Sequence, residues 1–164
     1  MKIIELRITD HERGLTLSTL LHELVHVATL IQYFDPETDE QVIGKEQLQY
    51  IAKNLRKHVD KVFDNPELAE QIFGGQKLSP EEIKEVFSDY INLMSDPTEA
   101  YEIITYALTE KRLQIFLKML PAMEGMPYSG KDKDRPGMEA SLWTQFTTAV
   151  RNLLGLADKN QDLL

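Results

Sequence analysis

The sequence contains no cysteine, so neither a disulfide framework nor a thiolate metal site is available to this chain. It also has no run of about 18 uncharged apolar residues, the length that a membrane-spanning helix needs. The N-terminal residues show no signal-peptide pattern. We therefore expect no membrane partner, and the lack of Cys fits a cytoplasmic protein.

Positive charge is also scarce. The chain has 18 Lys and Arg against 27 Asp and Glu, which gives a formal net charge of −9. Because phosphate binding requires clustered Lys and Arg, this balance argues against nucleic acid as the main ligand. The length of 164 residues, with 42% hydrophobic and 27% charged residues, predicts one globular domain over 1–164 with a sizeable core.

The most informative pattern that is present is the pentapeptide His-Glu-Leu-Val-His at residues 22–26. On a helix, residues four apart lie on the same face, so His22 and His26 can bind one metal ion together. Glu23 lies about 100° round the helix from His22, where it can hold a metal-bound water without binding the metal itself. The spacing predicts zinc bound by the two histidines, with Glu23 as the general base.

The setting of the pentapeptide strengthens this prediction. The segment 17–31 is apolar on nearly every face, which predicts a buried central helix. Two histidines and a carboxylate are costly in such a helix unless they are paired or metal-bound. The alternative is a core helix with two hydrogen-bonded histidines and a glutamate in an ordinary ion pair.

The remaining pattern predicts a mostly α-helical domain (α+β) with a small N-terminal strand or sheet. Ile4, Leu6 and Ile8 alternate with polar residues, as in a half-buried strand. Gly and Pro between residues 122 and 138 indicate a mobile loop. Apolar periodicity and helix-start signals predict a motif helix that ends near 34, a second from about 45 to 63, and a short third from 66 that stops at the glycines 74–75. They also predict a helix that starts at 80 and carries apolar residues up to 94, one over 97–120 with a break near 109, and a last one over 141–154.

A hydrolytic zinc site needs a third protein ligand beside the two histidines. His11, in the turn before the motif helix, and His58, at the edge of an apolar stripe, are weak candidates. Glu99 is the third residue after the predicted cap Asp96, where it is expected to bind the cap's own N–H. Glu102 has apolar neighbours that bring its carboxylate toward the core. Glu102 is the predicted third ligand, with Glu99 as the alternative.

Two further features bear on a substrate. Tyr106, one turn after Glu102, is the candidate donor to a tetrahedral oxyanion and Tyr101 a weaker one, although either can be a plain core aromatic. The segment 123–128, rich in Met and aromatic residues, can form a wall of a substrate cleft or an exposed hinge. The strand 3–9 is expected at a sheet edge facing the histidines, where an extended peptide can add to it.

The motif helix, followed much later by a helix that carries a glutamate, resembles the gluzincin metallopeptidases. More narrowly, three stretches look like the metallopeptidase domain of large polyvalent proteins from phages and conjugative elements. They are GLTLSTLLHELVHVAT at 14–29, EIITYALT at 102–109 and SLWTQFTTAVRNLLGL at 141–156. The resemblance implies a zincin-like fold and Zn²⁺ bound by His22, His26 and Glu102, with Glu23 as the general base.

The resemblance also implies a biological setting. The substrate would be a peptide or protein, and the chain would be one module of a larger polyprotein, in the cytoplasm of a host cell or associated with a virion. A non-catalytic or vestigial zinc-binding interaction module is the alternative, and a repressor-cleaving protease is a third possibility. Glu23 favours the enzyme, because a purely structural zinc site has no use for a carboxylate that activates water.

Overall fold

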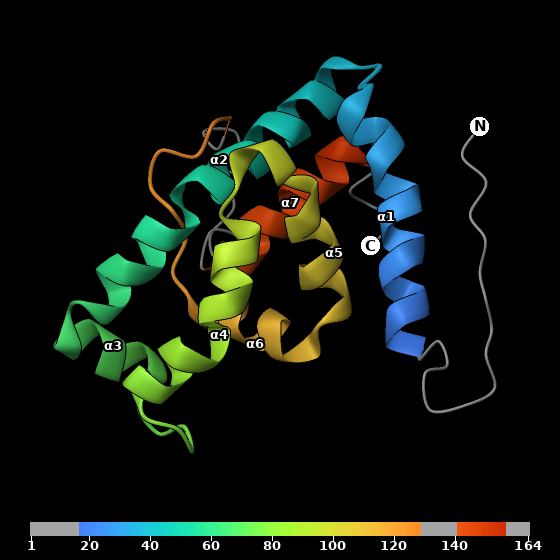
Figure 1. The fold of residues 1–164 in the computed structure, drawn as a ribbon. Coiled ribbons are helices and arrows are strands. Elements are labelled where there is room, and N and C mark those ends of the chain that lie inside the picture. Colours follow the sequence, from blue (N-terminus) through green and yellow to red (C-terminus); the bar gives the residue numbers. More distant parts are fainter. Residues whose placement is uncertain (1–16, 129–140, 157–164) are drawn as a thin grey trace, which may run out of the picture.

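The computed structural model of the chain describes residues 17–128 and 141–156, except for the side chains of Ser18, Thr19, Leu21 and His22. Every regular element in these ranges is helical (Figure 1). The predominantly helical class is therefore confirmed. The predicted strand 3–9 and His11 lie outside the described residues. The elements are α1 (Leu17–Phe34), α2 (Asp39–Phe63), α3 (Pro66–Phe73), α4 (Pro80–Met94), the 3₁₀ turn η1 (Pro97–Glu99), α5 (Tyr101–Thr109), α6 (Lys111–Met119) and α7 (Leu142–Leu153).

Helix α2 is the longest element, and α7 packs closely along its N-terminal half (Figure 1). Gly44 permits this approach, since a Cβ atom at this position would lie 2.3 Å from the backbone nitrogen of Leu153 and 2.6 Å from the carbonyl oxygen of Ala149. The buried apolar side chains of both helices form the centre of the core. They include Leu48, Ile51, Leu55, Phe146, Val150 and Leu153.

Local capping groups set several helix starts at the predicted positions. The side chain of Asn65 accepts a hydrogen bond from the backbone N–H of Leu68, and Ser79 does the same for Glu82. A proline follows each cap at the first helical position, where its missing N–H is not needed. The predicted break near Thr109 is also confirmed, since the extended backbone of Glu110 separates α5 from α6.

The predicted start of the second helix near Lys45 is wrong, because α2 begins earlier, at Asp39. Thr38 and Gln41 form a capping box: the N–H of Gln41 donates to Thr38 Oγ1 at 3.2 Å, and the N–H of Thr38 donates to Gln41 Oε1 at 3.2 Å. The acidic residues Asp39 and Glu40 then suit the positive end of the helix dipole. Apolar periodicity, which starts later, could not reveal this first turn.

Helix α1 lies at the edge of the described part of the molecule and packs mainly against α5 (Figure 1). It buries Thr29 and Tyr33, whereas Leu17 and Ile31 are 72% and 69% exposed. The prediction of a buried central helix is therefore wrong for the described side chains. An apolar composition on all sides does not tell which side meets the core. Among the described side chains of α1, the large apolar ones that are exposed are Leu17, Leu24, Val27, Ile31 and Phe34.

The described part of the segment between α6 and α7, residues 120–128, lies against the core. Met123 and Met126 are buried, and Gln145 of α7 bonds to both the backbone N–H and the carbonyl oxygen of Met123, at 2.7 and 2.9 Å. Gln47 Nε2 donates to the carbonyl oxygen of Pro127 at 3.0 Å. Mobility of 122–138 stays a prediction, and 129–138 lies outside the described residues.

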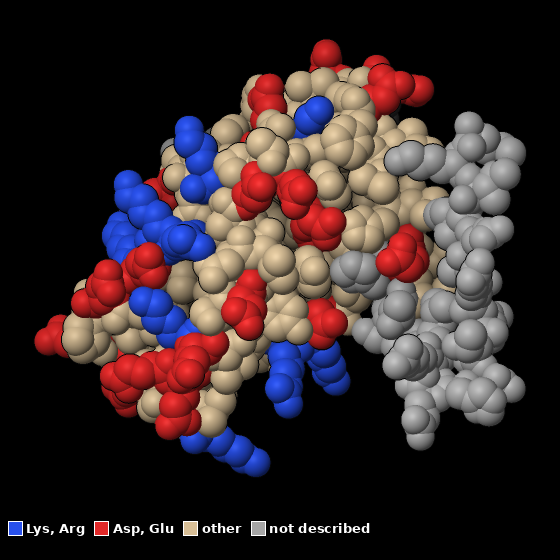
Figure 2. Space-filling view, viewed as in Figure 1, with Lys and Arg blue, Asp and Glu red and all other residues tan. Residues whose placement is uncertain are grey.

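Two surface properties complete the description. A shallow depression of about 520 Å³ is lined by Lys and Arg side chains on the C-terminal half of α2, together with Asp60 and Asp64. Figure 2 shows a group of Lys and Arg side chains at the left of the face, with acidic side chains scattered over the rest and further Lys and Arg side chains at its lower edge. None of the residues predicted from the sequence to form the site lines this depression.

Across the described ranges, no helix combines the length and hydropathy needed to cross a membrane.

Candidate metal centre

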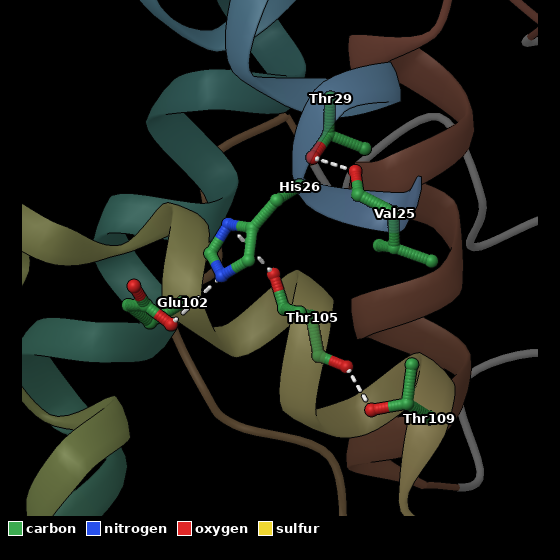
Figure 3. A network of polar contacts seen from close by, with 6 residues as sticks. All are labelled: Val25, His26, Thr29, Glu102, Thr105 and Thr109. Carbon is green, nitrogen blue, oxygen red and sulfur yellow. Dashed lines mark hydrogen bonds and ion pairs between the residues drawn. The ribbon is translucent and has the colours of Figure 1, made fainter. Parts of the chain in front are cut away.

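His26 is the centre of a small polar cluster between α1 and α5 (Figure 3). Its side chain is 13% exposed and points at α5, where its ring meets two side chains. Nε2 lies 3.4 Å from Oε2 of Glu102, and Nδ1 lies 3.3 Å from Oγ1 of Thr105. The ring also makes an edge contact with Tyr101, with 6.1 Å between centroids. Both ring nitrogens therefore face groups that can bond to them.

Helix geometry explains how these groups meet. Residues three apart share a helix face, so Glu102 and Thr105 of α5 point toward the same neighbour. On α1, His26 shares its face with Thr29 and Tyr33, which are the buried residues among the described side chains of that helix. Packing of the buried side of α1 on α5 thus carries the His26 ring to Glu102.

The distance between Nε2 of His26 and Oε2 of Glu102 is informative. A direct hydrogen bond between a nitrogen and a carboxylate usually measures about 2.7–2.9 Å when it is charge-assisted. Two ligand atoms at zinc bond lengths of about 2.0–2.2 Å in tetrahedral geometry lie about 3.3–3.5 Å apart. The observed 3.4 Å matches the second arrangement better than the first. His26 and Glu102 therefore lie at a separation that two ligands of one zinc ion can have.

The other two motif residues lie on α1. His22 is one turn before His26, and its side chain is outside the described set. The side chain of Glu23 is exposed to solvent on the same helix. No group of three His, Asp or Glu side chains able to hold a metal occurs among those described, a set that leaves out the side chain of His22.

Glu99, the alternative ligand, is exposed and belongs to the 3₁₀ turn η1. The predicted capping box from Asp96 to Glu99 is replaced here by a tighter turn. Oδ1 of Asp96 accepts hydrogen bonds from the backbone N–H of Thr98 at 2.9 Å and from its hydroxyl at 2.6 Å. These bonds lower the pKa of Asp96. Of the two glutamates, the structure places Glu102 beside His26.

His58 has a structural partner, as expected for a helix-edge histidine. Its Nε2 lies 2.7 Å from the carbonyl oxygen of Pro121. Burial lowers the pKa of His58, although the bond to Pro121 acts in the opposite direction. A neutral imidazole that donates to this carbonyl satisfies both groups, so the geometry accounts for His58 without a metal.

The two candidate tyrosines flank Glu102 on α5 and differ in their contacts. Tyr101 contacts the rings of His26, Tyr33 and Phe34. Tyr106 packs edge-on against Tyr90 of α4, with 5.9 Å between ring centroids. Burial raises the pKa of both Tyr101 and Tyr106, and the charge of Glu102 raises both further. Each hydroxyl therefore stays protonated near neutral pH and can act as a donor, and the choice between them stays a prediction.

Sequence reasoning missed Thr105, which is fully buried and faces His26. Its only signal in the sequence is its position three residues after Glu102, which places it on the same helix face. Sequence reasoning also missed the aromatic contacts that surround Tyr101, because these contacts depend on how α1 packs on α5.

Comparisons of this chain with protein-family models, with curated proteins and with solved structures found no match.

Proposed function

We propose that this chain is a zinc-dependent peptidase that hydrolyses peptide bonds in a peptide or protein substrate. The observation that carries the proposal is the meeting of His26, from the His-Glu-x-x-His pattern, with Glu102 at a separation suited to two zinc ligands. His22 would supply the third ligand, since it precedes His26 by one helical turn. Three protein ligands leave a fourth zinc position for water or substrate.

The residues around the metal divide the chemistry of hydrolysis among them. Bound zinc would supply a Lewis acid that polarises the scissile carbonyl and makes water more acidic. The carboxylate of Glu23 takes one proton from the attacking water and delivers it to the leaving amine nitrogen. The hydroxyl of Tyr106 or Tyr101 donates a hydrogen bond to the negatively charged oxygen that develops on the carbonyl carbon.

A second candidate is a zinc-binding interaction module within a larger polyprotein of a phage or mobile element. The exposed large apolar side chains of α1 favour it, because exposed apolar surface often marks a contact with another protein. Both candidates bind zinc. Only the peptidase hydrolyses peptide bonds, so only in the peptidase does a change at Glu23 alter the rate of hydrolysis.

The purified chain is expected to bind one Zn²⁺ and to gain thermal stability from it. Metal ligands on α1 and α5 link two helices, and a ligand that binds only the folded state stabilises it by mass action. Metal analysis and thermal unfolding with and without zinc measure both effects. A protein that takes up no zinc on reconstitution at neutral pH would remove the basis of the proposal.

Glu102→Ala is expected to release zinc at moderate chelator concentration, whereas Glu99→Ala is expected to keep it. Loss of a ligand removes a metal bond, while Glu99 lies exposed on η1. Zinc titrations of the two variants in the presence of a competing chelator compare their affinities directly. The reverse ranking would move the third ligand to Glu99.

A further inference from the structure

Thr105 places a hydroxyl group inside the interface between α1 and α5. Its side chain is fully buried, and its Oγ1 lies 3.3 Å from Nδ1 of His26 (Figure 3). A buried hydroxyl normally has a hydrogen-bond partner, and Nδ1 of His26 lies within reach of this one. The carbonyl oxygen of Thr105 accepts a separate bond from the hydroxyl of Thr109 at 2.6 Å.

The position of this hydroxyl bears on which tautomer the neutral imidazole adopts. A neutral imidazole carries its proton on one ring nitrogen, and the bond made by that nitrogen decides which one it is. A threonine hydroxyl can accept as well as donate. When Nδ1–H donates to Thr105 Oγ1, Nε2 carries no proton and its lone pair points to the side of the ring that faces Glu102.

We propose that Thr105 is a positioning residue that holds His26 in the Nδ1–H tautomer and fixes its ring, so that Nε2 points to the metal position beside Glu102. This inference rests on the proposed zinc site. Partners of the second ring nitrogen commonly orient metal-binding histidines, and their loss costs about 10–100-fold in metal affinity. Thr105 serves this role from the helix that also carries Glu102, so one element sets both ligands.

The test is the substitution Thr105→Val, which keeps the shape of the side chain and removes the hydroxyl. Zinc affinity, measured by competition with a chelator, is expected to fall by about 10–100-fold. Thr105→Ser, which restores a hydroxyl, is expected to recover most of it. Substitution of zinc by Co²⁺ gives a second readout, since the absorption spectrum of bound cobalt reports ligand geometry and is expected to change in the valine variant.

Two matched controls separate this role from general packing. The hydroxyl of Thr109 bonds to the carbonyl oxygen of Thr105, and that of Thr29 bonds to the carbonyl oxygen of Val25 at 2.7 Å. Thr109→Val and Thr29→Val thus each remove a bond from a threonine to its own helix and are expected to leave zinc affinity within about two-fold.

The outcomes distinguish the inference from the proposed function. If Thr105→Val keeps wild-type zinc affinity and the wild-type cobalt spectrum, the positioning role is wrong and the zinc site stands. An equal loss in the Thr109→Val and Thr29→Val controls would also overturn the positioning role, because the effect would then be one of packing. If the wild-type protein binds neither zinc nor cobalt, the proposed function fails together with this inference.

Discussion

Glu23→Gln is expected to lower peptide hydrolysis by about 10²–10⁴-fold, the usual contribution of general acid–base catalysis. The amide has nearly the shape of the carboxylate, but it cannot take a proton from water. Because Glu23 is proposed to act on water and not to bind the metal, zinc content should stay at the wild-type level. Hydrolysis of a peptide library and metal analysis of the same preparation measure the two effects together.

The histidines provide the contrast for this experiment. His22→Ala and His26→Ala are expected to lose both zinc and hydrolysis, since each removes a ligand. Glu37→Gln, at an exposed position near the start of α2, is a matched control that should change neither. Loss of zinc in Glu23→Gln would mean that the roles assigned to these neighbours are wrong. Unchanged hydrolysis in a zinc-loaded variant would exclude Glu23 as the general base.

Gly44→Ala is expected to destabilise the fold by about 1–3 kcal/mol, the usual cost of overpacking a core. In an isolated helix the same change stabilises by about 1 kcal/mol, so the expected sign is reversed by the tertiary contact. The added Cβ would meet backbone atoms of Leu153 and Ala149, which no side-chain rotation can move away. Relief requires α2 and α7 to separate.

Denaturant unfolding of the Gly44→Ala variant measures this cost as a lower midpoint with an unchanged slope. Lys53→Ala, at an exposed position in the same helix, is the control and should stay within about 0.5 kcal/mol of the wild type. A variant at Gly44 that gains stability would show that the two helices do not approach as closely as described.

Local signals in the sequence predicted the helices where a capping group or a breaker acts on its own neighbours. Ser79 and Asn65 start helices, and the break near Thr109 ends one, through contacts within a few residues. The true start of α2 was missed because the prediction relied on apolar spacing and overlooked the reciprocal bonds of Thr38 and Gln41. A capping box of this kind can be predicted from a sequence, because it needs only a Thr or Ser followed three residues later by a Gln or Glu.

The packing of one helix against another was harder to predict from the sequence. The apolar residues of α1 predicted its helicity correctly, but not that one side would stay exposed, since composition carries no direction. Glu102 could be selected because Ile103 and Ile104, which follow it, are apolar, and the structure buries both. Thr105 could not, because its contact with His26 depends on how the ring is turned, and the packing of α1 on α5 determines that orientation.

The peripheral position of α1 has a consequence for local opening. Its buried side rests mainly on α5, while the central packing of the described part joins α2 to α7. Helix α1 can therefore detach at a lower free energy than the whole domain unfolds. Zinc held by both α1 and α5 would raise this opening free energy, by about 2.7 kcal/mol at a free zinc concentration 100 times the dissociation constant. The metal would then hold α1 against α5, and metal loss would expose the apolar interface of α1 to proteases and to other chains.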